Sequence, residues 1–148
     1  MTLYEAKVVA GVCQFLRKHH FKQVRYIPTR KRGEDIEAVT PDKRYLVTIE
    51  AKGATSSDPG SNRYGKPFTS TQVLDHVSKA VYCAAQHSLG NKLSGVAFPK
   101  NDDHIKRVNA ILPILRKLGI EVFWVNANGK VEVTKHWRVW KKPENGKA

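Results

Sequence analysis

An acid and an amine stand two residues apart at the end of an otherwise apolar segment of the chain. Residues 44–52 read Arg-Tyr-Leu-Val-Thr-Ile-Glu-Ala-Lys and are rich in β-branched and aromatic residues, which is typical of a β-strand. Because successive side chains of a strand point to opposite faces, Glu50 and Lys52 are neighbours on one face. Charges are costly to bury unless they are paired or bound to a metal ion. The pair therefore marks a candidate chemical site.

A second carboxylate, Asp35, lies in the preceding predicted strand, residues 34–40. Residues 41–43, Pro-Asp-Lys, predict a turn, and antiparallel pairing across it could bring Asp35 and Glu50 together. Two carboxylates form a hard-oxygen site suited to Mg²⁺, with Mn²⁺ as a possible substitute. The metal would activate a water and stabilise charge on a phosphate, while Lys52 could position that water.

Three further acids bear on this site. Glu37 shares a strand face with Asp35, and either Glu37 or Asp42 could be the true acid in its place. Glu5 falls in the middle of the apolar stripe of a helix predicted over residues 3–19. It either points inward, where it could contact a metal ligand or bind a second metal ion, or it is an N-terminal acid that reaches solvent and is stabilised by the helix dipole.

Two segments resemble the PD-(D/E)xK nuclease superfamily, which has the restriction-endonuclease-like fold. They are residues 33–38, Gly-Glu-Asp-Ile-Glu-Ala, and residues 45–53, Tyr-Leu-Val-Thr-Ile-Glu-Ala-Lys-Gly. The resemblance covers roughly residues 3–100, and it departs from the motif at Glu34, where proline often stands.

This resemblance implies a metal-dependent endonuclease. Asp35, Glu50 and the Ala51 carbonyl would be the metal ligands. The catalytic set implied for this chain is Asp35, Glu50, Lys52, Glu5 and Gln72.

Gln72 belongs to a helix predicted over residues 70–88, where it forms one polar stripe with His76 and Lys79. In related nucleases a polar Gln or Lys on this helix often flanks the active site. A capping box between Thr69 and Gln72 explains the glutamine equally well. His76 and Lys79 either contact nucleic acid or lie on a solvated helix edge.

The charge balance points to a polyanionic partner. Lys and Arg number 26 against 13 Asp and Glu, which gives a net charge of +13 and a pI near 9.9. A domain this basic is expected to bind nucleic acid. In the tail, Trp137 and Trp140 stand among cations and could stack on bases. The residues predicted to bind nucleic acid are Arg30, Lys31, Arg32, Arg63, Lys66, His76 and Lys79.

The elements that must hold these residues follow the order αβββαβαββ. The expected fold is α/β, a three-layer-type sandwich with a mixed central sheet. The resemblance implies an αβββαβ restriction-endonuclease-like core, followed by a C-terminal α-β-β extension. The predicted ranges are helix 3–19, strands 22–27, 34–40 and 44–52, helix 70–88, strand 94–98, helix 102–118, which Pro113 kinks or divides, and strands 120–125 and 130–134.

Residues 1–142 are expected to form a single nuclease-like domain, with a disordered tail at 143–148. No signal peptide or membrane-length apolar run is seen, so the expected location is cytoplasmic and no membrane partner is expected. DNA is favoured over RNA as substrate, and cutting both strands of a duplex would favour a homodimer. The alternatives are a catalytically inactive nucleic-acid-binding domain of the same fold, and a basic α/β domain whose acids form ordinary ion pairs.

Overall fold

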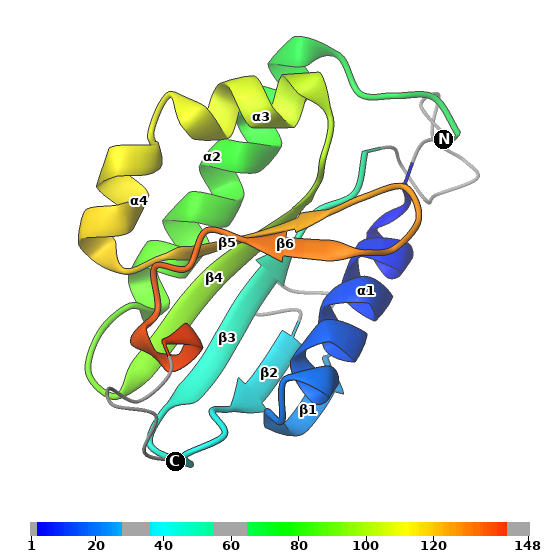
Figure 1. Cartoon of the computed structure of the whole chain (residues 1–148). Coiled ribbons are helices and arrows are strands. Elements are labelled where there is room, and N and C mark those ends of the chain that lie inside the picture. The colour runs from blue at the N-terminus through cyan, green and yellow to red at the C-terminus, as the bar shows by residue number, and fades with distance from the viewer. Residues whose placement is uncertain (1–2, 28–35, 55–64, 142–148) are drawn as a thin grey trace.

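The structure is a computed structural model that describes residues 3–27, 36–54 and 65–141 (Figure 1). Within these residues the chain forms one curled, mixed sheet of six strands with helices on both sides, which confirms the α/β class and the mixed sheet. The elements are α1 (Glu5–Lys18), β1 (Lys22–Tyr26), β2 (Ile36–Val39), β3 (Leu46–Ala51), α2 (Ser70–His87), β4 (Lys92–Pro99), α3 (Asp102–Asn109), α4 (Leu112–Leu118), β5 (Glu121–Val125), β6 (Val131–Val133) and a 3₁₀ turn, η1 (Arg138–Trp140).

The strands lie side by side in the order in which they occur in the chain. β1, β2 and β3 form an antiparallel meander, β3, β4 and β5 are parallel, and β6 returns antiparallel to β5. Parallel neighbours need long crossover connections, which the helical segments α2 and α3–α4 supply. β3 and β4 are therefore central strands.

Helices bury both faces of the sheet. On one face, α1 packs through Val8, Val12 and Leu16 against β-strand residues that include Val47 and Ile49. On the other face, α2, α3 and α4 enclose a second apolar cluster with β4 and β5. Covering both faces explains why β3 reads as a nearly continuous apolar run.

Local signals in the sequence locate the helix boundaries. Thr69 and Gln72 form the predicted capping box, with the Gln72 N–H donating to Thr69 Oγ1 at 3.2 Å and the Thr69 N–H donating to Gln72 Oε1 at 2.8 Å. The predicted helix 102–118 is divided into α3 and α4, and Pro113 lies in the first turn of α4. Proline is tolerated there because the first N–H groups of a helix have no partner within the helix.

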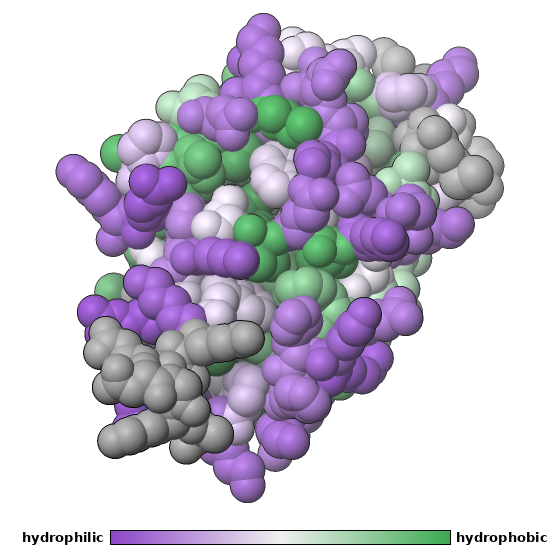
Figure 2. All heavy atoms as spheres, in the orientation of Figure 1, coloured by the Kyte–Doolittle hydropathy of each residue, from purple (hydrophilic) through white to green (hydrophobic). Residues whose placement is uncertain are grey.

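Hydrophilic side chains dominate the face of the molecule seen in Figure 2 and surround smaller hydrophobic patches. In the part of the chain that the structure describes, no helix has both the length and the apolar character needed to cross a membrane.

The two C-terminal tryptophans, which were predicted to stack on bases, pack against the hydrophobic core instead of forming an open surface. Trp137 is only 2% exposed, and its indole N–H donates to the Gly119 carbonyl at 3.0 Å. Trp140 stacks on Trp137 with ring centroids 5.9 Å apart and also packs against Phe123. Both rings therefore complete the hydrophobic core on the α1 side of the sheet.

A buried carboxylate holds this C-terminal segment in position. Glu121, fully buried on β5, accepts hydrogen bonds from the backbone N–H groups of His136 at 3.0 Å and Trp137 at 3.1 Å. The Thr134 hydroxyl and the Trp140 indole N–H also donate to it. A buried charge is tolerated when hydrogen bonds satisfy it, so Glu121 has a structural role.

We predict that Glu121→Ala lowers the free energy of unfolding by roughly 3 kcal/mol or more, because buried donors lose their acceptor. Glu121→Gln should cost less, since one acceptor oxygen remains. Urea denaturation measures both. The control is Glu132→Ala, which removes an exposed β6 carboxylate paired with Lys100 and should cost less than about 1 kcal/mol. Equal losses for the two alanine variants would contradict the anchoring role.

Candidate active site

Glu50 and Lys52 meet at the end of β3. The Lys52 ammonium lies 3.5 Å from Glu50 Oε1, and Glu50 is only 8% exposed. Val47, Ile49 and Ala51 belong to the cluster beneath α1. The alternation of a strand therefore directs Glu50 and Lys52 toward the opposite side of the sheet, which α2 covers.

The pair lies where the chain leaves the sheet. The Lys52 N–H donates to the Ala97 carbonyl of β4 at 3.0 Å, continuing the parallel pairing of the two strands by one bond. This is the carboxyl end of β3 and β4. Open α/β sheets bind ligands in the crevice outside the carboxyl ends of their parallel strands, so the position suits a reactive site.

Glu5 is brought to the same end of the sheet. A Cβ atom on Gly53 would collide with the Glu5 backbone nitrogen and would lie 2.9 Å from the Tyr4 carbonyl carbon. The Ala54 N–H also donates to the Leu3 carbonyl at 2.7 Å. Only glycine permits this close approach, and so α1 begins directly against the residue that follows Lys52.

His76 reaches the site from α2. It is half-buried, and its ring meets the Phe68 ring edge to face with centroids 4.4 Å apart. The Phe68 N–H donates to the Ala54 carbonyl at 3.0 Å, which ties the start of α2 to the end of β3. Burial lowers the pKa of His76, and the positive charge of Lys52 lowers it further. His76 therefore lies in the surroundings of Lys52 rather than on an open helix edge.

A second histidine, His104, was not identified from the sequence. It is fully buried on α3, and its Nδ1 lies 2.8 Å from Asn101 Oδ1, which also accepts the His104 backbone N–H at 3.0 Å. Burial, with a smaller effect of His76, lowers the pKa of His104 to about 4. The imidazole is thus neutral at pH 7, and because Asn101 Oδ1 is an acceptor, Nδ1 carries the proton.

The other predicted residues of α2 have ordinary structural surroundings. Gln72 uses its side-chain oxygen in the capping box, which supports the structural explanation of this residue. Lys79 is exposed and forms an ion pair with Asp75 at 3.0 Å, one helical turn away. Lys66 is exposed beyond the N-terminus of α2.

The two alternatives to Asp35, Glu37 and Asp42, have different surroundings in the structure. Glu37 lies opposite Thr48 on the neighbouring strand and accepts a hydrogen bond from Arg25 Nε at 3.1 Å. Since cross-strand partners share a face, Glu37 lies on the same side of the sheet as Glu50, one diagonal step away. It is engaged by Arg25, but it is still a candidate by position.

Asp42 lies at the wrong end of β3 to be the acid of this site. It accepts hydrogen bonds from the Thr40 hydroxyl at 2.6 Å and the Arg44 N–H at 3.0 Å, and the Thr40 bond is the main reason that its pKa is lowered. β3 begins only at Leu46, and the strand rise alone separates Leu46 from Glu50 by about 13 Å. Asp42 caps the turn that precedes β3.

The metal-binding prediction extends beyond the described part of the chain. Asp35 lies outside it, as do the predicted nucleic-acid-binding residues Arg30, Lys31, Arg32 and Arg63. Across residues 3–27, 36–54 and 65–141, no three His, Cys, Asp or Glu side chains form a group that could hold a metal ion. The described donors near the site, the Glu50 carboxylate and the backbone around Ala51, are oxygen ligands of the kind that Mg²⁺ prefers.

No protein-family model, curated protein or solved structure matches the chain. The resemblance to the PD-(D/E)xK superfamily therefore rests on residues 33–38 and 45–53.

We predict that His104 makes folding sensitive to acid. Below about pH 6.5 the unfolded chain protonates this histidine, whereas the folded chain keeps it neutral until about pH 4, so stability falls across this window. The loss should reach about 3 kcal/mol, and His104→Leu should reduce it. Urea denaturation at pH 7 and pH 4.5 measures the difference. An unchanged pH dependence in the variant would show that His104 is not buried as a neutral group.

Proposed function

We propose that this chain is a metal-dependent endonuclease that hydrolyses phosphodiester bonds of nucleic acid, with DNA favoured over RNA as the substrate. The observation that carries the proposal is the buried Glu50 with Lys52 at 3.5 Å, at the carboxyl end of a central strand. The order α1-β1-β2-β3-α2-β4 supports a restriction-endonuclease-like core, because it has the αβββαβ arrangement, with the acid on β3 and the lysine directly after this strand.

In this proposal Asp35, Glu50 and the Ala51 carbonyl hold Mg²⁺, or Mn²⁺ in its place. A bound ion of this kind supplies a Lewis acid beside the phosphate. The register of the meander supports the pairing of the two acids, because Ile36 pairs with Ile49. Asp35 and Glu50 are the chain neighbours of these two residues.

Lys52 has two tasks in the proposed reaction. Its ammonium offsets the charge of Glu50, which would otherwise be costly at 8% exposure. It also carries N–H donors that can hold a phosphate oxygen or orient the attacking water. Glu5, which begins α1 beside Gly53, is a further acid within reach of this end of the sheet.

The net charge of +13 supports a nucleic-acid partner independently of the acids. It equally favours a second candidate, a binding domain of the same fold without catalysis, because phosphate contact needs only cations. A homodimer belongs to the first proposal, since one site per chain cuts one strand of a duplex at a time. A cytoplasmic location belongs to the same proposal.

We predict that the chain cleaves plasmid DNA in Mg²⁺ or Mn²⁺ but not in EDTA. Glu50→Ala and Lys52→Ala should each reduce the rate at least about 100-fold, because each removes a group that stabilises charge at the reacting phosphate. A gel assay of cleavage rates on single-stranded DNA, branched DNA and RNA, run in parallel, ranks the substrates.

The matched control is Glu132→Ala, which also removes a glutamate paired with a lysine, but on the exposed side of β6. It should cleave at the rate of the unmodified chain. Cleavage that survives Glu50→Ala would exclude the proposed site. Tight binding with no cleavage under any metal would select the second candidate.

We also predict that Asp35→Ala abolishes metal-dependent cleavage while Glu37→Ala retains most of it, because Glu37 is already held by Arg25. Calorimetric titration with Mn²⁺ should show weaker binding for Asp35→Ala alone. The reverse ranking in both measurements would make Glu37 the metal ligand.

A further inference from the structure

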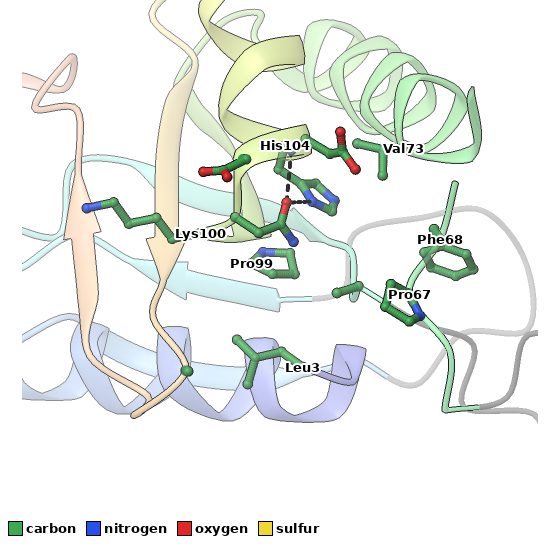
Figure 3. A pocket seen from close by; sticks show the side chains of 12 residues that line it. Leu3, Pro67, Phe68, Val73, Pro99, Lys100 and His104 are labelled. Atoms are coloured by element: carbon green, nitrogen blue, oxygen red, sulfur yellow. Dashed lines mark hydrogen bonds between the residues drawn. The ribbon is translucent and has the colours of Figure 1, made fainter. Parts of the chain in front are cut away.

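A cavity of about 330 Å³ lies among the segments that follow β3, β4 and β5 and the start of α3 (Figure 3). Ala54, two residues after Lys52, forms part of its lining, and so does Pro99, the last residue of β4. The cavity thus opens at the carboxyl end of the parallel strands, and its size is within the range of about 300–1,000 Å³ found for small-molecule sites.

The walls of the cavity are mainly apolar and include several rings. Pro67 and Phe68 lie on one side in Figure 3, and Pro99 lies across from them, with Leu3 below and Val73 above. Phe68 is held in place by the edge-to-face contact of its ring with His76. Walls of this kind suit a flat aromatic ligand, which gains stacking and apolar contact on both faces.

The remaining side of the cavity is polar and comes from the start of α3. The Asn101 side-chain oxygen is occupied by two bonds from His104, while its amide N–H₂ has no partner within the described residues. The exposed carboxylates of Asp102 and Asp103 stand beside it. Lys100 also lines the cavity, and its ammonium forms an ion pair with Glu132. This edge therefore offers an amide donor next to carboxylate acceptors.

We infer that the cavity receives one unstacked nucleobase of the nucleic-acid substrate. Each base carries a hydrogen-bond donor next to an acceptor on its pairing edge, which matches the carboxylates and the Asn101 amide. Enzymes that take up a single base in this way hold it between apolar side chains and hydrogen-bond its edge.

This inference deepens the proposed function and rests on its nucleic-acid substrate. Ala54 lies two residues after Lys52, at most about 7 Å away along the chain, so a base held in the cavity keeps its own backbone close to the proposed reacting groups. Extracting a base from an intact duplex costs a few kcal/mol. The geometry therefore favours DNA with an unpaired base, such as a bulge, a branch point or a single strand.

The test compares two DNA duplexes that differ at one bulged position, which carries either adenosine or an abasic sugar. Fluorescence anisotropy in EDTA measures the affinity of the full chain for each. The adenosine bulge should bind at least about fivefold more tightly, as expected for one stacked base.

Ala127→Trp places an indole in the cavity from an exposed position on its lining and should abolish the preference. Ala110→Trp, at an exposed position at the other end of α3, is the matched control and should retain it. Equal affinity for both bulges, or a preference that survives Ala127→Trp, overturns the base pocket and leaves the proposed nuclease standing. A preference with no metal-dependent cleavage keeps the pocket and removes the nuclease, and no binding to either duplex removes both.

Discussion

The Glu50–Lys52 ion pair places a carboxylate where a central strand leaves almost no room for water. β3 is flanked by β2 and β4 and covered by helices on both faces, so the glutamate cannot be hydrated as it would be on an edge strand. Its charge is offset by the lysine of the same strand. The segments around this pair pack closely. Gly53 permits α1 to start against the end of β3, and the Phe68 N–H, just before α2, donates a hydrogen bond to the Ala54 carbonyl.

Much of this architecture can be predicted from local patterns. Period-two alternation over residues 44–52 indicates β3 and correctly puts Glu50 and Lys52 on one face, because strand geometry leaves only two directions for a side chain. The Thr69–Gln72 capping box and the division at Pro113 are likewise local, since each depends on residues within one helical turn. The position of Asp35 is still a prediction, because it lies outside the described residues.

The features that the sequence did not reveal depend on distant contacts. Glu121 reads as one acid in an apolar strand, and its donors follow it by 13 to 19 residues. The same contacts bury Trp137 and partly bury Trp140, which were expected to meet nucleic acid. His104 is different, since its partner Asn101 is only three residues away. Asn101 as the cap of α3 predicts that contact, but the burial of His104 depends on how α3 packs against α2 and the sheet.

The aromatic cluster around Trp140 determines what intrinsic fluorescence can report. Trp137 and Trp140 are two of the three tryptophans in the chain, and Trp140 packs against Phe15 and His19 at the C-terminal end of α1. The Glu50–Lys52 pair lies near the other end of this helix, about 20 Å away. Emission from these two indoles will therefore follow the seating of the C-terminal segment during unfolding. The third tryptophan, Trp124, packs against Phe98 on the other face of the sheet and reports on that half of the molecule.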